Sequence, residues 1–256
     1  MLNLGRTAES SLAIPADSRF GFLLVGAGRS GTSLLTALLD QHSRLEVGFE
    51  VGSMDCLRGQ ALVDEPERLF QQRSGAFVER CIAAAASSPA PLWGNKITTE
   101  QLAGLNKHNL YHLPPLNILD AFFNGVLADL PVIYLLRDGR ACVQSKLART
   151  AQSLEQACDS WRYAVEVYEF LQARPHTLFL RFEDLLLAPE SELERVLAFL
   201  GVKFEPGLVS GEGTMHPGML PAYRRPGIDP ARATDLDVSH PCVALIEPEL
   251  RRCGYL

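Results

Sequence analysis

The chain has 256 residues, 47% of them hydrophobic and 21% charged, with a formal net charge of −6 at pH 7. This length and composition are typical of a globular enzyme and predict a single domain over residues 1–256. The negative charge argues against nucleic acid as the main partner. No apolar stretch reaches the roughly 20 residues that a membrane span needs. Residues 1–19 also lack the pattern of a signal peptide, so we expect a cytoplasmic protein that does not contact membranes.

Residues 1–18 are polar and lack periodicity, which predicts a loose arm before the first strand. The apolar run over 20–25 predicts a buried strand, and leucines at helical spacing predict a helix ending near residue 39. Between them lies the turn GAGRSGTS, whose glycines allow successive backbone N–H groups to converge on an anion at the helix N-terminus. The candidate anion-binding residues are Gly28, Arg29, Ser30, Gly31, Thr32 and Ser33.

This turn differs from the phosphate-binding loop of nucleotide triphosphatases, GxxxxGK[ST], because Thr32 stands where that loop has lysine. The lysine normally stabilises charge on the β and γ phosphates of ATP or GTP. Its absence, with Arg29 inside the turn, favours a diester-like or less charged anion. A tight turn between strand and helix that binds no ligand is the structural alternative.

Further strands are predicted over residues 44–50, 92–98, 132–136 and 177–182. Helices are predicted over 64–87, 114–130, 140–151, 190–200 and 246–256, with a longer helix that begins near Ser153. Alternation of strands and helices predicts an α/β fold of three layers, in which helices flank a central parallel sheet. Glycine and proline dominate residues 205–227, which suggests a lid or an acceptor-binding loop.

Charged residues follow several of the predicted strands. Arg29, Glu50, Lys96 and Arg137 lie at or near strand ends, so we expect them to meet beyond the carboxyl edge of the sheet, where such folds bind ligands. Ser145 and Arg149 are one helical turn apart and could join Arg137 in binding a second phosphate.

Each of these residues also has a structural alternative. Glu50 could be a solvated carboxylate at a strand end, and Lys96 a surface lysine. Arg137 could form an ion pair with Asp138 that caps the next helix.

The motifs resemble those of sulfotransferases that use 3′-phosphoadenosine 5′-phosphosulfate (PAPS). GAGRSGTSLL is similar to their 5′-phosphosulfate signature and LLRDGRACVQSKLAR to their 3′-phosphate signature, with Arg137 and Ser145 on the matching positions. LRFEDLLLAPESELERVLAFLG is similar to the segment that follows, so the resemblance covers roughly residues 20–204.

Within that superfamily the chain most resembles tyrosylprotein sulfotransferases. His42, Gly48 and Glu50 reproduce their H-x-x-x-x-x-G-x-E stretch, in which the glutamate is the catalytic base. Lys96 resembles the lysine of their NKDP segment, and Arg149 matches a nucleotide-binding arginine. Phe182 stands where the family has a nucleotide-contacting tyrosine, and the family's cysteine pairing and membrane anchor are not reproduced.

The resemblance implies transfer of a sulfuryl group from PAPS to a hydroxyl group, with 3′,5′-adenosine bisphosphate as the second product. Glu50 would act as general base, while Lys96, Arg29 and the loop N–H groups would stabilise the leaving phosphate. A sulfuryl group carries less charge than a phosphoryl group, so we expect no metal.

The acceptor is left open by the sequence, as is the oligomeric state. A phenol, a tyrosine in a peptide and a small-molecule or carbohydrate alcohol all fit. We expect residues 51–75, 100–115 and 205–227 to select among them. A P-loop kinase or NTPase with a degenerate loop, and a noncatalytic nucleotide-binding module, are the alternative functions.

Overall fold

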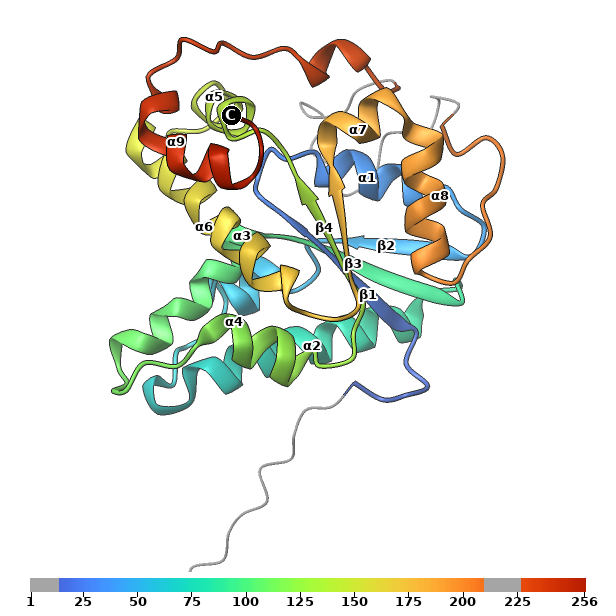
Figure 1. The fold of residues 1–256 in the computed structure, drawn as a ribbon. Coiled ribbons are helices and arrows are strands. Elements are labelled where there is room, and N and C mark those ends of the chain that lie inside the picture. Colours follow the sequence, from blue (N-terminus) through green and yellow to red (C-terminus); the bar gives the residue numbers. More distant parts are fainter. Residues whose placement is uncertain (1–13, 210–226) are drawn as a thin grey trace, which may run out of the picture.

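A computed structural model of the protein describes residues 14–209 and 227–256 (Figure 1). Its central sheet has parallel strands in the order β2-β3-β1-β4-β5. The strands are β1 (Phe20–Gly26), β2 (Leu45–Phe49), β3 (Leu92–Thr98), β4 (Val132–Leu136) and β5 (Thr177–Arg181). The predicted α/β fold with a parallel central sheet is confirmed.

Helices cover both faces of this sheet. The α-helices are α1 (Thr32–Leu39), α2 (Leu69–Ser87), α3 (Thr99–Leu102), α4 (Ile118–Asp120), α5 (Gly139–Leu147), α6 (Leu154–Gln172), α7 (Phe182–Leu187), α8 (Pro189–Phe199) and α9 (Cys242–Arg252). Short 3₁₀ or π turns are η1 (Ser53–Leu57), η2 (Pro66–Arg68), η3 (Ala103–Leu110), η4 (Ala121–Val126) and η6 (Pro230–Ala233). None of the helices in the described ranges is both long enough and apolar enough to cross a bilayer.

The three layers follow from side chains that alternate along apolar strands. In β1, Leu23 and Val25 point into the core that contains α2, α6 and α9. Phe22 and Leu24 point into the opposite core, formed with α1, α7 and α8. Because parallel strands are buried on both faces, an unbroken apolar run rather than an alternating pattern marks them in the sequence.

The helix predicted over 114–130 begins later than expected. Asn117 caps it by accepting a hydrogen bond from the Asp120 N–H, and α4 then continues as the π turn η4. Pro114 and Pro115 stay outside the helix, since a residue that precedes proline is disfavoured in helical conformation. The prediction of a helix from residue 114 was wrong at its start.

Other boundaries also differ. Most of the segment 100–115, which we expected to be a loop that helps to select the acceptor, is helical, because α3 and η3 together span residues 99–110. The helix predicted over 140–151 ends at Leu147, and the last helix spans Cys242–Arg252 rather than 246–256. Residues 1–13 of the predicted arm, and 210–226 of the predicted lid or acceptor loop, lie outside the described residues.

The glycine turn depends on a left-handed residue packed against a buried ring. Gly31 has φ +95°, and a Cβ atom there would lie 2.2 Å from Cδ2 of the fully buried Phe182. We therefore expect Gly31→Ala to lower the unfolding free energy by about 2–4 kcal/mol, through backbone strain together with overpacking. Denaturant titration measures this change.

The control is Gly201→Ala, because Gly201 is also left-handed, at φ +69°, but has open space where a Cβ would lie. Gly201→Ala should lower the unfolding free energy through backbone strain alone, by about 1–2 kcal/mol. Equal losses in the two variants would show that the contact with Phe182 does not constrain the turn.

Candidate functional site

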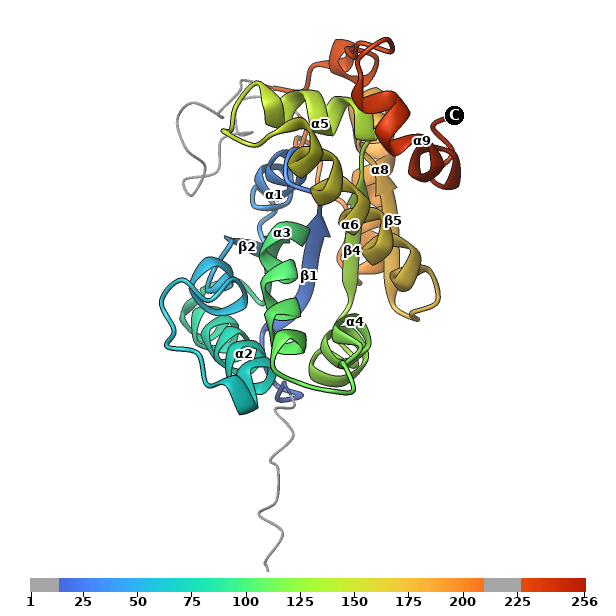
Figure 2. The same ribbon diagram turned by 90° about the vertical axis from the view of Figure 1, so that its left-hand side faces the viewer.

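The predicted site residues gather at the carboxyl ends of the strands. Figure 2 shows α1, α3 and α5 around the upper end of β1, with α5 crossing above it. The turn between β1 and α1 lies at this edge, as do Glu50 after β2 and Arg137 after β4. Lys96 lies within β3, near its end. The topology therefore brings together residues from four strands that are far apart in the sequence.

The turn exposes backbone donors because two of its residues are left-handed. Arg29 has φ 75° and Gly31 has φ 95°. The Ser30 N–H donates back to the Ala27 carbonyl, 3.0 Å away, which closes the turn. Thr32 then opens α1, and N–H groups in the first turn of a helix have no carbonyl acceptor within that helix. This arrangement suits an anion at the start of α1.

Arg137 holds the turn from β4. Its Nη1–H group donates to the Arg29 carbonyl at 2.9 Å, and its guanidinium carbon lies 4.4 Å from the centroid of the Phe182 ring. Its Nε atom and the Ser30 hydroxyl are buried and have no hydrogen-bond partner among the described residues. Buried polar atoms without partners are costly, so these two fit a site in which a polar ligand completes the hydrogen bonding.

Arg29 and Ser145, assigned from the sequence to different phosphates, are in contact. The Arg29 Nε–H group donates to the Ser145 hydroxyl at 3.1 Å, which joins the glycine turn to α5. Asp138, considered as a partner for Arg137, instead pairs with Arg140 and caps α5 through the Arg140 N–H.

The predicted shared helical face of Ser145 and Arg149 was wrong. Helix α5 ends at Leu147, and Arg149 lies beyond it with its N–H bonded to the Lys146 carbonyl at 3.0 Å. Arg149 is exposed. A role for Arg149 toward a phosphate stays a prediction.

Glu50 and Lys96 form an ion pair at the edge of the sheet. Glu50 is left-handed, with φ 62°, and its N–H donates to the Lys96 carbonyl at 2.9 Å. The Lys96 ammonium contacts the Glu50 carboxylate and lies 4.2 Å from the centroid of the Phe49 ring. Lys96 is only 3% exposed, so it is not a surface lysine, and burial lowers its pKa despite the nearby carboxylate.

Gln101 is a site residue that sequence reasoning missed. Its amide nitrogen donates to the second oxygen of Glu50 at 2.6 Å. Its amide oxygen accepts from the Thr98 N–H at 2.8 Å, which fixes the orientation of the amide group. The sequence does contain a pattern that could have identified Gln101, because Thr98 and Gln101 have the spacing of a capping box at the start of a helix.

Glu100 is a second residue that was missed. Its carboxylate oxygens lie 3.1 and 2.9 Å from the Gly28 nitrogen and accept its hydrogen, and the carboxylate also pairs with the buried Lys146 ammonium. Burial alone would raise the pKa of Glu100, but Lys146 and the Gly28 N–H bring that pKa below its usual value. The glycine turn therefore contacts a side-chain anion of its own chain.

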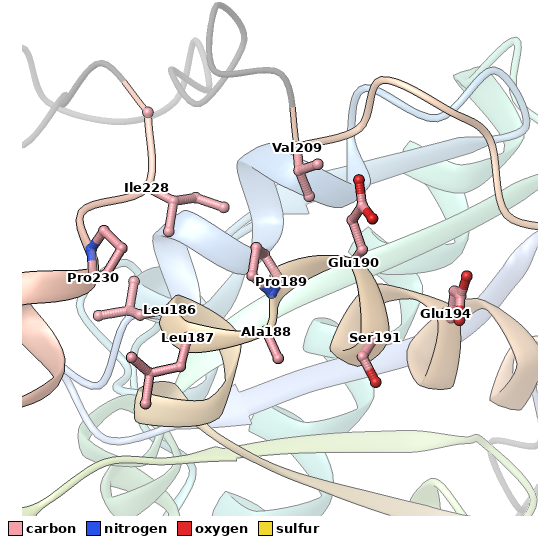
Figure 3. Close-up of a pocket in the computed structure, with 11 residues that line it drawn as sticks. Leu186, Leu187, Ala188, Pro189, Glu190, Ser191, Glu194, Val209, Ile228 and Pro230 are labelled. Carbon is pink, nitrogen blue, oxygen red and sulfur yellow. The ribbon is translucent and has the colours of Figure 1, made fainter.

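A separate pocket lies between α7, α8 and residues 227–230 (Figure 3). Its lining is mostly apolar, with two glutamates at the α8 side. The lining residues are Leu186, Leu187, Ala188, Pro189, Glu190, Ser191, Glu194, Val209, Gly227, Ile228 and Pro230. None of the predicted anion-binding residues is among them, so this pocket is distinct from the glycine turn.

The motifs and this geometry agree with a comparison against known protein families. A model of the sulfotransferase family matches residues 22–206, which is most of the chain. The chain belongs to the sulfotransferase family. The resemblance expected from the two phosphate signatures is confirmed.

The chain is also similar to individual sulfotransferases. It is 26% identical over 211 residues to a protein-tyrosine sulfotransferase of Drosophila melanogaster, covering 73% of this chain but only 39% of that relative. The sulfotransferase domain from the curacin biosynthetic pathway has a TM-score of 0.60 at 17% identity, covering 93% of this chain and 98% of that one. The corresponding domain of the Synechococcus PCC 7002 olefin synthase also has a TM-score of 0.60, at 20% identity, with 94% and 98% covered. These two structures share the fold.

The Glu100–Lys146 pair makes the stability of the protein depend on pH. The pKa of Glu100 is lower in the folded chain than its usual value of 4.5. Ionised Glu100 therefore stabilises the fold at any pH above 4.5, and this stabilisation is lost as the pH falls through the pKa of the folded state. We expect Glu100→Gln to be less stable than wild type at pH 7. That difference should shrink below pH 4.5.

Urea titrations at several pH values measure the difference. Glu79→Gln removes an exposed glutamate on α2 and serves as the control, with a difference from wild type that should stay small throughout. A Glu100→Gln difference that did not change with pH would contradict the assignment of a stabilising carboxylate at this position.

Proposed function

We propose that this sulfotransferase transfers a sulfuryl group from PAPS to a hydroxyl acceptor, with Glu50 as the general base. The observation that supports it most directly is the placement of Glu50, held between the Lys96 ammonium and the Gln101 amide. This group lies at the same edge of the sheet as the glycine turn. A carboxylate fixed beside a ligand site is well suited to accept the proton of an attacking hydroxyl group.

The donor would occupy two anion subsites in this proposal. The N–H groups of Gly31, Thr32 and Ser33, with the side chains of Arg29 and Lys96, would hold the 5′-phosphosulfate, since the Gly28 and Ser30 N–H groups donate to Glu100 and to the Ala27 carbonyl. Arg137 and Ser145, together with Arg149, would hold the 3′-phosphate. The unpartnered Arg137 Nε and Ser30 hydroxyl fit such a ligand. Cationic side chains would then provide the charge stabilisation that Mg²⁺ gives in phosphoryl transfer.

The proposed reaction is an in-line displacement at sulfur. The acceptor oxygen forms a bond to sulfur while the bond between sulfur and the 5′-phosphate oxygen breaks. Glu50 takes the proton from the acceptor hydroxyl, and 3′,5′-adenosine bisphosphate leaves with the bonding electron pair. Atoms and charge balance without a further reactant.

The ion pair links the proton transfer to the leaving group. Before reaction, the Lys96 ammonium is held by the Glu50 carboxylate. A protonated Glu50 no longer carries the negative charge that holds Lys96. The ammonium can then stabilise the charge that develops on the departing phosphate.

The acceptor class is also a proposal. The Drosophila relative is named a protein-tyrosine sulfotransferase, which supports tyrosine or another phenol. A small-molecule alcohol remains the alternative. Membership of the sulfotransferase family favours sulfuryl transfer over the kinase or NTPase alternative.

The catalytic role of Glu50 is tested by Glu50→Gln. Loss of the base should lower the rate of sulfuryl transfer by about 10²–10⁴-fold. Binding of the bisphosphate should be retained or tightened, because Glu50 contacts neither proposed phosphate and its loss frees Lys96 for the 5′ group. Transfer of ³⁵S from labelled PAPS to a tyrosine peptide and to simple phenols and alcohols measures the rate.

The matched control is Glu46→Gln in β2, the strand that Glu50 follows, where the Glu46 carboxylate accepts from the Ser88 hydroxyl. It should keep the wild-type rate to within about threefold. Wild-type activity in Glu50→Gln would exclude Glu50 as the base. Tight bisphosphate binding with no transfer to any acceptor would favour the noncatalytic module.

A further inference from the structure

Glu100 places a negative charge directly on the glycine turn. Its two carboxylate oxygens share the Gly28 N–H, and a Cβ atom at Gly28 would lie 3.0 Å from the nearer oxygen. A backbone donor of the turn is therefore taken by a carboxylate rather than left for a ligand. The missing side chain of Gly28 makes room for that carboxylate.

Lys146 balances this charge from α5. Its side chain is only 4% exposed and forms an ion pair with Glu100, which is itself 19% exposed. Lys146 follows Ser145, the residue that accepts from Arg29. The pair therefore joins the turn, the start of α3 and the last turn of α5 at the point where the two proposed anion subsites meet.

The electrostatic field around the glycine turn depends on the Glu100–Lys146 pair. Arg29, Lys96, Arg137 and Lys146 all lie around the turn, which would make the site strongly attractive to highly charged anions. Glu50 and Glu100 offset part of that positive charge. Because the pair is mostly buried, solvent screens it weakly, and removing one partner changes the field at the turn.

We propose that Glu100 is a specificity-determining residue that, together with Lys146, limits the negative charge that the turn accepts at the 5′ end of the donor. The proposal rests on the proposed function, since it assumes that the turn binds the 5′ group. The Glu100 carboxylate repels a concentrated negative charge and so favours the singly charged sulfuryl end over a phosphoryl end. It also lowers the affinity of the turn for the 5′-phosphate of the product.

Two probes that differ only in the 5′ group separate this effect from general binding. Adenosine 3′-phosphate has no 5′ charge, whereas 3′,5′-adenosine bisphosphate carries a 5′-phosphate. Calorimetry gives the ratio of their affinities for wild type, Glu100→Gln, Lys146→Met and the double variant. Asp64→Asn, which removes the partner of Arg73 and Lys107 away from the turn, controls for the loss of an ion pair elsewhere.

We expect Glu100→Gln to raise the preference for the bisphosphate about tenfold and Lys146→Met to lower it about tenfold, because the two changes shift the local charge in opposite directions. The double variant should return to within about threefold of wild type. Asp64→Asn should leave the ratio unchanged. A purely structural role would weaken binding of both probes in both single variants, which would overturn the proposal.

An unchanged or lowered ratio in Glu100→Gln would also overturn it. Thermal melts establish that each variant is folded. If Glu100→Gln does not fold, recovery of the Lys146→Met defect in the double variant supports the proposal, and failure to recover refutes it. If wild type binds neither probe, the proposed function fails rather than the role of Glu100 alone.

Discussion

The site depends on how the backbone between β1 and α1 is held. Glu100 from α3 accepts the Gly28 N–H, Arg137 after β4 donates to the Arg29 carbonyl, and the Phe182 ring packs against Gly31. The turn contains left-handed residues, which are costly unless the surroundings fix them. Three elements distant in sequence thus fix one short segment, and that segment presents the donors for an anion. The contacts that stabilise the turn are therefore also the contacts that shape the candidate site.

The charges at this edge include two carboxylate–lysine pairs near the carboxyl end of β3. Glu50 pairs with Lys96 and Glu100 pairs with Lys146. Both lysines are almost fully buried, where an unpaired ammonium would be strongly unfavourable. Removal of either carboxylate would therefore destabilise the folded chain, and each pair keeps a cation close to the proposed anion subsites. Protonation or removal of a carboxylate changes what its lysine can bind, which connects stability with the proposed chemistry.

The sheet and much of the site were predictable from the sequence, since continuous apolar runs mark buried parallel strands and residues at their carboxyl ends meet at one edge. This reasoning correctly placed Arg29, Glu50 and Arg137 together. It missed Glu100 because the helix that starts at Thr99 is short and carries little periodicity. Arg149 was wrongly placed within α5, because nothing in the composition marks the end of that helix at Leu147. Helix ends and contacts between elements depend on packing that local patterns do not encode.

The proposed nucleotide site is tested most directly by calorimetric titration of wild type, Arg137→Ala and the control Arg140→Ala. Each protein is titrated with 3′,5′-adenosine bisphosphate and, separately, with Mg-ATP. Arg140 lies in the first turn of α5, three residues after Arg137, and its guanidinium is paired with Asp138. We expect wild type to prefer the bisphosphate, Arg137→Ala to lose about 10–100-fold in affinity, and Arg140→Ala to lose far less. A preference for Mg-ATP, or bisphosphate binding that does not depend on Arg137, would contradict the proposed nucleotide site.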